Sequence, residues 1–127
     1  MLGTLQDSRL SLEALHRFPN GPVETECGLC WEVSRLFAEL KIGLKIAADR
    51  KLPIKSISCD AWGLDYFLLN ESGEVMEPTF CYRDSRNQQG IDRALDALSW
   101  ETIYEETGIQ FVQINSLFQM AAESKER

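Results

Sequence analysis

The sequence lacks several features that define large classes of proteins. It has no apolar run approaching the ~18 residues of a membrane-spanning helix, and it has no Gly-rich phosphate-binding loop. Its first residues show neither the basic flank nor the long apolar stretch of a secretion signal. Lys and Arg do not cluster, and the net charge is -7. These absences predict a cytoplasmic protein that binds neither membranes nor nucleic acid.

Side chains that bind metals are also few. The chain has one histidine, His16, and four cysteines at positions 27, 30, 59 and 81. Only Cys27 and Cys30 have the spacing of a ligand pair, so the pattern favours cysteines that pack as small apolar side chains over a zinc site. We therefore predict no bound metal and no cofactor.

The length and composition predict one folded domain over residues 1–127. Hydrophobic residues make up 44% and charged residues 26% of the chain. A chain of this size can bury roughly two-thirds of its unfolded surface, so it needs no disulfide to hold a core. The result expected is a single domain with its own core.

The periodicity of apolar residues predicts both helices and strands. Ser8 or Ser11 can cap a first helix that ends near Phe18, and Asn115 can cap a last helix before a solvated, charged tail at 123–127. The other elements expected are a helix over 28–41, strands over 44–48, 54–59 and 62–69, a hairpin loop at 70–73 leading into 74–76, helices over 91–98 and 99–107, and a strand over 109–114. Together they predict an α+β fold, with an antiparallel sheet flanked by helices.

Three short runs resemble a known family in their order. They are Gly28-Leu29-Cys30 at the start of an expected helix, Asp60-Ala61-Trp62, and the turn from Gly73 to Thr79 that contains Glu77-Pro78. They resemble the Gly-x-Cys helix, the His-Ala-Trp strand and the Asp-Pro-Thr turn of transglutaminase-like, or papain-like, proteins. The resemblance covers residues 27–80 and implies a transglutaminase-like core.

The resemblance departs from the family at the residues that perform catalysis. Asp60 stands where the family has its catalytic histidine, and Glu77 stands where it has aspartate. Attack by a cysteine needs a thiolate, which an adjacent imidazole generates. Aspartate is too weak a base for a thiol. The scaffold is therefore expected to be a non-catalytic one, a pseudoenzyme.

The leading hypothesis is a non-catalytic acidic binding protein of the immunity, antitoxin or inhibitor type. It would act by occupying a protein partner, and the excess of acidic residues favours a basic partner. Trp31 lies off the apolar stripe of its expected helix and could anchor that partner, although it could instead cover the end of the sheet. The acidic binding surface is expected to include Glu101, Glu105 and Glu106.

Two enzymatic hypotheses remain open from the sequence. In the first, the protein is a cysteine hydrolase or acyltransferase that uses Cys30 with Asp60 and Glu77. In the second, Cys27 and Cys30 form a dithiol redox pair. The sequence does not determine the oligomeric state or the identity of the partner.

Overall fold

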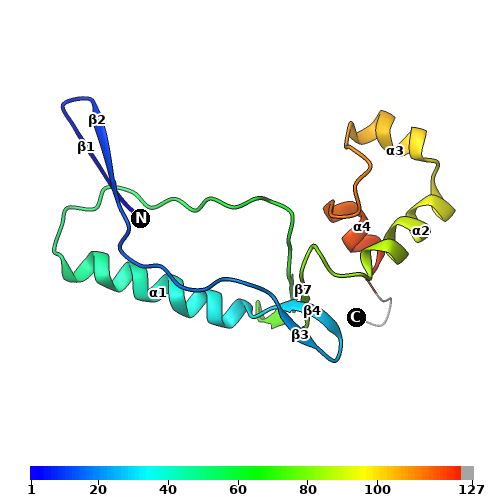
Figure 1. Ribbon diagram of the computed structural model, residues 1–127, viewed down its shortest axis with the longest axis horizontal. Helices are drawn as coiled ribbons and strands as arrows, with labels where there is room; N and C mark the ends of the chain where they lie inside the picture. Colours follow the sequence, from blue (N-terminus) through cyan, green and yellow to red (C-terminus); the bar gives the residue numbers. More distant parts are fainter. Residues whose placement is uncertain (124–127) are drawn as a thin grey trace. The chain divides into compact units, whose positions relative to one another are not determined.

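The computed structural model describes residues 1–123, which fall into two compact units (Figure 1). The hairpin–helix unit comprises Met1–Gly21 and Glu32–Asp60, and the small-sheet unit comprises Pro22–Trp31 and Ala61–Arg127. Most of the charged tail expected to be solvated, residues 124–127, lies outside the described part. The single domain expected over 1–127 stays a prediction.

The hairpin–helix unit begins with two antiparallel strands where a helix was expected. Strands β1 (Leu2–Gln6) and β2 (Arg9–Glu13) pair through the two-residue turn Asp7-Ser8, at which both residues have positive φ values of 50° and 60°. Such a turn matches the right-handed twist of a hairpin. The expected helix from Ser8 or Ser11 is wrong because the leucines of β2 alternate with polar residues, which is the period of a strand.

Helix α1 (Val33–Asp49), drawn in cyan in Figure 1, is longer than expected at its carboxyl end. The sequence indicated a helix that stops before Gly43 and a strand over 44–48, but the helix continues through both. One internal glycine costs a helix only ~1 kcal/mol, and good helix formers surround it. The helix ends at Arg50, and Lys51 after it has φ 53°.

Polar contacts tie the segment before α1 to the helix. The His16 ring stacks on Phe18, and its Nε2 lies 2.5 Å from Oε2 of Glu39. At the end of α1, Arg50 donates a hydrogen bond of 2.7 Å to Glu13, and this bond lowers the pKa of the Glu13 carboxyl. None of the residues of this unit, all of which the structure describes, is buried. The unit therefore has no core of its own.

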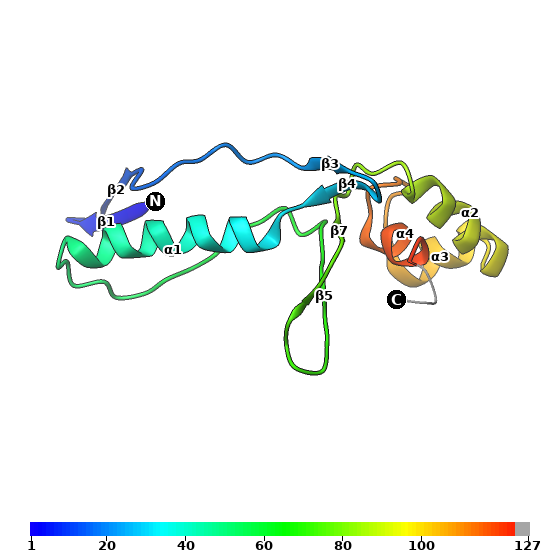
Figure 2. The same ribbon diagram turned by 90° about the horizontal axis from the view of Figure 1, so that it is seen from below.

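The small-sheet unit contains five short strands. Strands β3 (Val23–Thr25), β4 (Gly28–Trp31) and β7 (Thr79–Phe80) form an antiparallel sheet in the order β3-β4-β7. Strands β5 (Leu68–Leu69) and β6 (Val75–Met76) form a separate hairpin, and β5 and its loop are seen in green in Figure 2. This hairpin confirms the loop expected at 70–73.

Several of the other expected strands and helix starts are wrong. Residues 28–31 form strand β4 rather than the first turn of a helix, because Cys30 and Trp31 pair with Phe80 and Thr79. The expected strands over 54–59 and 109–114, and 62–67 of the strand expected over 62–69, have no regular secondary structure. A strand needs a neighbour for its hydrogen bonds, and these described segments have none.

Three helices complete the unit: α2 (Asn87–Ala97), α3 (Trp100–Thr107) and α4 (Ser116–Ala121). The Ser99 hydroxyl caps α3 by accepting a hydrogen bond from the Thr102 amide, and Gly108 ends it at φ 66°, in agreement with the helix expected over 99–107. Asn115 precedes α4 as expected, but its side chain donates to the Gln110 carbonyl instead of capping the helix.

The described residues form an α+β structure with small antiparallel sheets. Its buried apolar residues all lie in the small-sheet unit: Cys30, Cys81, Ile103 and Phe118. Within residues 1–123, no helix is long and apolar enough to cross a membrane. A transglutaminase-like core is not supported, because the cysteine of the motif lies on a strand.

Candidate functional site

The three residues expected to form a cysteine site are placed in different settings. Cys30 lies in β4 and is 4% exposed, and its Sγ lies 3.5 Å from the Thr25 hydroxyl. Asp60 is exposed in an irregular segment of the other unit. Glu77 is exposed, and its carboxylate accepts a hydrogen bond from the Thr79 amide. Within the described residues of the small-sheet unit, the side chains of Cys30 and Glu77 share no hydrogen bond.

The residues expected to bind a partner are also separated. Trp31 is half-buried at the end of β4, and its indole N–H is engaged within the unit. Glu101, Glu105 and Glu106 are exposed on α3. Trp31 is thus a structural neighbour of the loop that follows β7. Of the three glutamates, Glu106 also lines a cavity between α2, α3 and α4, whereas Glu101 and Glu105 do not.

Side chains from three segments meet around Asp65 in what we call the Asp65 cluster. The Trp31 indole N–H and the Tyr82 amide both donate to Oδ1 of Asp65, each at 2.8 Å. Trp62 is 82% exposed and its ring lies 6.5 Å from that of Tyr82, while Arg83 donates to the Tyr82 hydroxyl. Within residues 1–123, Oδ2 of Asp65 accepts no hydrogen bond. The cluster therefore combines a fixed carboxylate, two aromatic faces and a guanidinium.

A buried carboxylate holds the loop that carries Tyr82. Asp84 is 6% exposed and accepts hydrogen bonds from the amides of Leu29 (2.6 Å) and Arg86 (2.8 Å). The Asn87 side chain is fully buried and donates to the Tyr82 carbonyl at 2.7 Å. These bonds join β4 to the loop and to the start of α2, and so fix the position of the Tyr82 amide that contacts Asp65.

A second polar group joins β7 to the end of α4. The Arg86 guanidinium lies 3.7 Å from the centre of the Phe80 ring and donates to Oε1 of Glu123 at 3.2 Å. The Tyr66 hydroxyl donates to the same oxygen at 2.7 Å. Burial raises the pKa of Tyr66 to about 12, the bond to Glu123 adds to the rise, and Arg86 opposes it. Tyr66 is therefore a neutral donor at physiological pH.

The four cysteines carry free thiols. Cys27 and Cys59 are exposed, whereas Cys30 and Cys81 are buried, and burial raises the pKa of the Cys81 thiol. Cys27 lies in the turn before β4, so the Cys27–Cys30 pair does not begin a helix. In the part of the chain that the structure describes, no group of three or more His, Cys, Asp or Glu side chains could hold a metal ion.

Sequence reasoning missed Asp65, Tyr82 and Arg83. The sequence predicts no helix or strand over residues 81–90, and its motifs give Asp65 no role. One signal was available: Tyr82-Arg83-Asp84-Ser85-Arg86 concentrates aromatic and charged residues in a loop, where binding residues are often placed. The pairing of that loop with Asp65 could not be read from either segment alone.

Comparison with known proteins gives relatives of one kind. The chain is 38% identical over 121 residues to a rhamnulokinase of Mannheimia succiniciproducens, which is 95% of this chain and 25% of that protein. It is 34% identical over 120 residues to a rhamnulokinase of Oceanobacillus iheyensis and 32% identical over 126 residues to one of Bacillus subtilis, in each case over 26% of the relative. No protein-family model matches the sequence. The chain thus spans about a quarter of the length of the curated relatives it matches.

These relatives correct the functional hypotheses drawn from the sequence. The similarity runs through 94–99% of the chain, whereas the transglutaminase-like resemblance rested on three short runs. The relatives are all named rhamnulokinase. The hypotheses of an immunity, antitoxin or inhibitor protein, a pseudoenzyme, a cysteine hydrolase or acyltransferase, and a dithiol redox protein are therefore wrong. The motif misled because a Gly-x-Cys run is compatible with a strand as well as with a helix start.

Proposed function

We propose that this chain acts as one quarter of a sugar kinase of the rhamnulokinase type, a cytoplasmic enzyme that transfers a phosphoryl group to rhamnulose. The observation that carries the proposal is the 38% identity over 95% of the chain to a rhamnulokinase. Rhamnulokinases of several bacteria match nearly the same residues at 32–38% identity. A similarity that extends over almost every element supports a shared role better than a short motif does.

The Asp65 cluster is the part of the chain whose chemistry suits a sugar. A carboxylate accepts hydrogen bonds from hydroxyl groups, and an aromatic face such as that of Trp62 can cover the C–H face of a sugar ring or chain. Arg83 adds donors. Because Trp31 and the Tyr82 amide use only Oδ1 of Asp65, Oδ2 remains as an acceptor. The cluster is therefore proposed to bind and orient the sugar.

The same cluster is poorly suited to the phosphoryl donor. A nucleoside triphosphate carries several negative charges, and proteins bind it with several amides and cations. The Asp65 cluster has one guanidinium beside a carboxylate. We infer that residues in the other three quarters of such a kinase hold the donor. Catalysis of phosphoryl transfer depends mainly on placing the two substrates in line, so positioning the sugar is the contribution proposed for this chain.

A chimera tests the proposal directly. The matching quarter of the Mannheimia succiniciproducens rhamnulokinase is replaced by this chain, and rhamnulose-dependent ADP release is measured. The chimera is expected to be active. Within it, Asp65→Asn keeps an oxygen for the bonds from Trp31 and Tyr82 but removes the charge, so KM for rhamnulose should rise at least tenfold. Asp92→Asn, an exposed position on α2, is the matched control and should change KM less than twofold.

The outcome that overturns the proposal is a chimera that folds, as judged by a cooperative thermal transition, yet releases no ADP with rhamnulose. An active chimera in which Asp65→Asn and Asp92→Asn have equal effects would leave the kinase assignment in place and remove the sugar from the Asp65 cluster. The two results therefore separate the role of the chain from the role of the site.

A further inference from the structure

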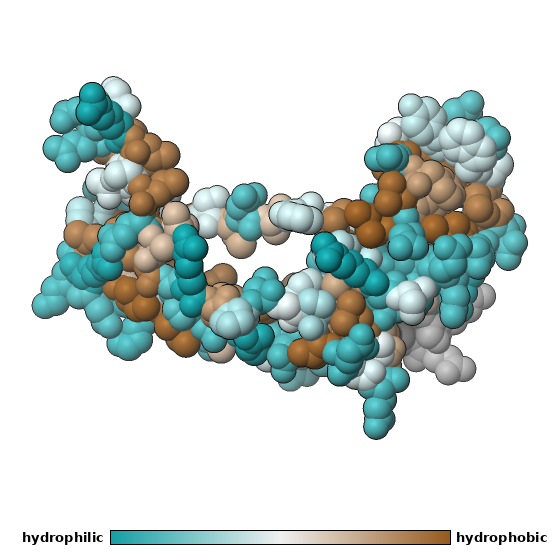
Figure 3. Space-filling view, viewed as in Figure 1, coloured by the Kyte–Doolittle hydropathy of each residue, from teal (hydrophilic) through white to brown (hydrophobic). Residues whose placement is uncertain are grey.

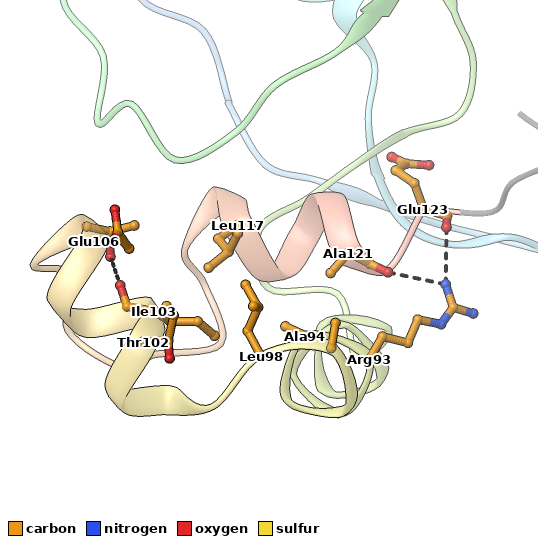
Figure 4. Close-up of a pocket in the computed structure, with 11 residues that line it drawn as sticks. Arg93, Ala94, Leu98, Thr102, Ile103, Glu106, Leu117, Ala121 and Glu123 are labelled. Atoms are coloured by element: carbon orange, nitrogen blue, oxygen red, sulfur yellow. Dashed lines mark hydrogen bonds between the residues drawn. The ribbon is translucent and has the colours of Figure 1, made fainter.

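Helices α2, α3 and α4 surround an apolar cavity of about 750 Å³ (Figure 4). Its lining includes Ala94 and Leu98 of the α2 region, Ile103 of α3, and Leu117 and Ala121 of α4. Figure 4 shows the side chains of Leu98 and Leu117 directed into the space between the helices. The cavity lies wholly within the small-sheet unit.

Helices α2 and α4 pack closely at Gly90, whereas the leucines that line the cavity remain partly exposed. At Gly90 the backbones of α2 and α4 are in such close approach that a Cβ there would lie 1.8 Å from the Phe118 carbonyl oxygen. Away from this contact, Leu98 is 54% exposed and Leu117 is 38% exposed. Figure 3, in the view of Figure 1, shows apolar residues in brown at the surface in this region.

An open apolar cavity of this size favours an occupant. Burial of apolar surface stabilises a protein, and unfilled space between helices costs stability. The volume is large enough for several side chains from one face of a helix, which is how amphipathic helices bind in grooves. Leucine side chains at the two walls suit apolar anchors from such a helix.

The charges around the cavity indicate which charged side chains should flank the apolar face of an occupant helix. The charged residues that line the cavity are Arg93, Glu106 and Glu123, and the Glu123 carboxylate accepts hydrogen bonds from Arg86 and Tyr66. Arg93 donates to the carbonyls of Ala121, Ala122 and Glu123 at the end of α4, so its charge is directed to that helix end. Glu106 lines the cavity on the side of α3. An occupant with Lys or Arg beside its apolar face would complement this surface.

We propose that this cavity receives an amphipathic, basic-flanked helix from the other three quarters of a rhamnulokinase-length chain. The proposal rests on the proposed function, since the curated relatives are about four times as long as the stretch that this chain matches. The cavity is thus an internal docking surface of the larger protein, and it attaches the α2–α4 helices to the remainder of the kinase.

Thiol labelling at two leucines of the same helical region tests the proposal. Leu98 lines the cavity and is 54% exposed, whereas Leu95 is 42% exposed and does not line it. In the 127-residue chain, Leu98→Cys and Leu95→Cys should react with iodoacetamide at rates within threefold of each other, as resolved by peptide mass spectrometry. In the chimera, labelling of Leu98→Cys should slow at least tenfold, and labelling of Leu95→Cys should not change.

A charge reversal gives a second readout. In the chimera that carries Leu98→Cys, Glu106→Lys should restore at least half of the labelling rate because it repels a basic helix. Asp92→Lys, at an exposed position of α2 that does not line the cavity, should not restore it. Equal labelling of the two cysteine variants in the chimera would overturn the proposal.

Two results in the 127-residue chain would assign the cavity to another occupant. Protection of Leu98→Cys that grows with protein concentration would assign it to a second copy of the chain. Protection of Leu98→Cys that is lost after unfolding and refolding would assign it to a small apolar ligand.

The result is separable from the test of the proposed function. A chimera that phosphorylates rhamnulose but labels both cysteine variants equally refutes the docking helix alone. A chimera without kinase activity in which only the Leu98→Cys variant is protected refutes the kinase assignment and leaves the docking surface.

Discussion

Gly28 and Asp84 approach each other so closely that a Cβ at position 28 would lie 2.5 Å from Oδ2 of Asp84. Gly28 has φ 128°, a conformation that side chains rarely adopt, and the next amide, that of Leu29, donates to this same oxygen at 2.6 Å. The start of β4 is therefore shaped by a residue 56 positions later in the sequence. The Asp65 cluster depends on this contact, because β4 carries Trp31 and the Asp84 loop carries Tyr82.

Gly28→Ala is expected to lower the free energy of unfolding by about 2 to 4 kcal/mol, from backbone strain and the weakened Leu29–Asp84 hydrogen bond. Urea unfolding followed by circular dichroism measures the loss. Gly21→Ala is the matched control, since Gly21 has no atom within 4 Å of an added Cβ and no positive φ. Equal stabilities of the two variants would contradict the close approach of β4 and the Asp84 loop.

A second pair of glycines tests the contact between α2 and α4. Gly90→Ala places a methyl group against the Phe118 carbonyl, a backbone atom that cannot rotate away, so α4 must shift or detach. We expect a loss of about 3 kcal/mol or more, in the range of severe overpacking. Gly43→Ala in α1 should be neutral or stabilising by up to ~1 kcal/mol, because its Cβ would make an ordinary 3.6 Å contact with His16 and alanine favours a helix.

Thermal unfolding of the two alanine variants provides the measurement. The helix content of Gly90→Ala should also fall in the far-ultraviolet spectrum, whereas that of Gly43→Ala should be retained. If both variants unfold at the temperature of the original chain, α2 and α4 do not pack through Gly90.

The elements that could be predicted from the sequence are those whose signals are local. Ser99 and Gly108 bound α3 because a hydroxyl cap and a left-handed glycine act within one helical turn. The loop at 70–73 was predicted correctly for the same reason, since the Asn70 side chain accepts a hydrogen bond from the amide of Glu74, only four residues away. Each of these signals is complete within a few residues.

The elements that could not be predicted depend on distant residues. Residues 28–31 read as a helix start, yet their strand conformation is set by Asp84 and by pairing with β7. The Asp65 cluster likewise joins three segments, and its hydrogen bonds cannot be predicted from any one of these segments alone. The helix over 8–18 failed for a different reason. Leu12, Leu15 and Phe18 have a helical spacing, but Leu10 and Leu12 alternate with polar residues, and the Asp7-Ser8 turn pairs them in a hairpin.

The reactivity of the four cysteines should follow their burial. Cys27 and Cys59 are exposed and should be alkylated by iodoacetamide first, at pH 8, in the native chain. Cys81 is 1% exposed, and burial raises the pKa of its thiol, so it should react at least 100-fold more slowly than a free cysteine until the chain unfolds. Mass spectrometry of digested samples resolves the order. Rapid modification of Cys81 under native conditions would show that the loop after β7 opens easily.

Alkaline pH should weaken the link between Tyr66 and Glu123. Burial and the Glu123 bond raise the pKa of Tyr66 to about 12 in the folded chain, above the value of ~10 for an unfolded tyrosine. A group with a raised folded pKa contributes stability that is complete below its unfolded pKa. Stability from Tyr66 should therefore be constant up to pH ~10 and fall as the pH rises toward 12.

Tyr66→Phe isolates this contribution. The variant loses the 2.7 Å bond to Glu123, so it should be about 1 kcal/mol less stable at neutral pH. Between pH 10 and 12 the difference between the two proteins should shrink, since ionisation of Tyr66 in the unfolded state favours unfolding of the original chain only. Tyr104→Phe, at a position that is 54% exposed, is the control and should keep the pH dependence of the original chain. Urea unfolding at pH 7, 10 and 11 gives the three curves. A stability difference that does not change with pH would mean that Tyr66 has the same pKa in the folded and unfolded states. The bond from Tyr66 to Glu123 would then not hold the end of α4 to the rest of the small-sheet unit.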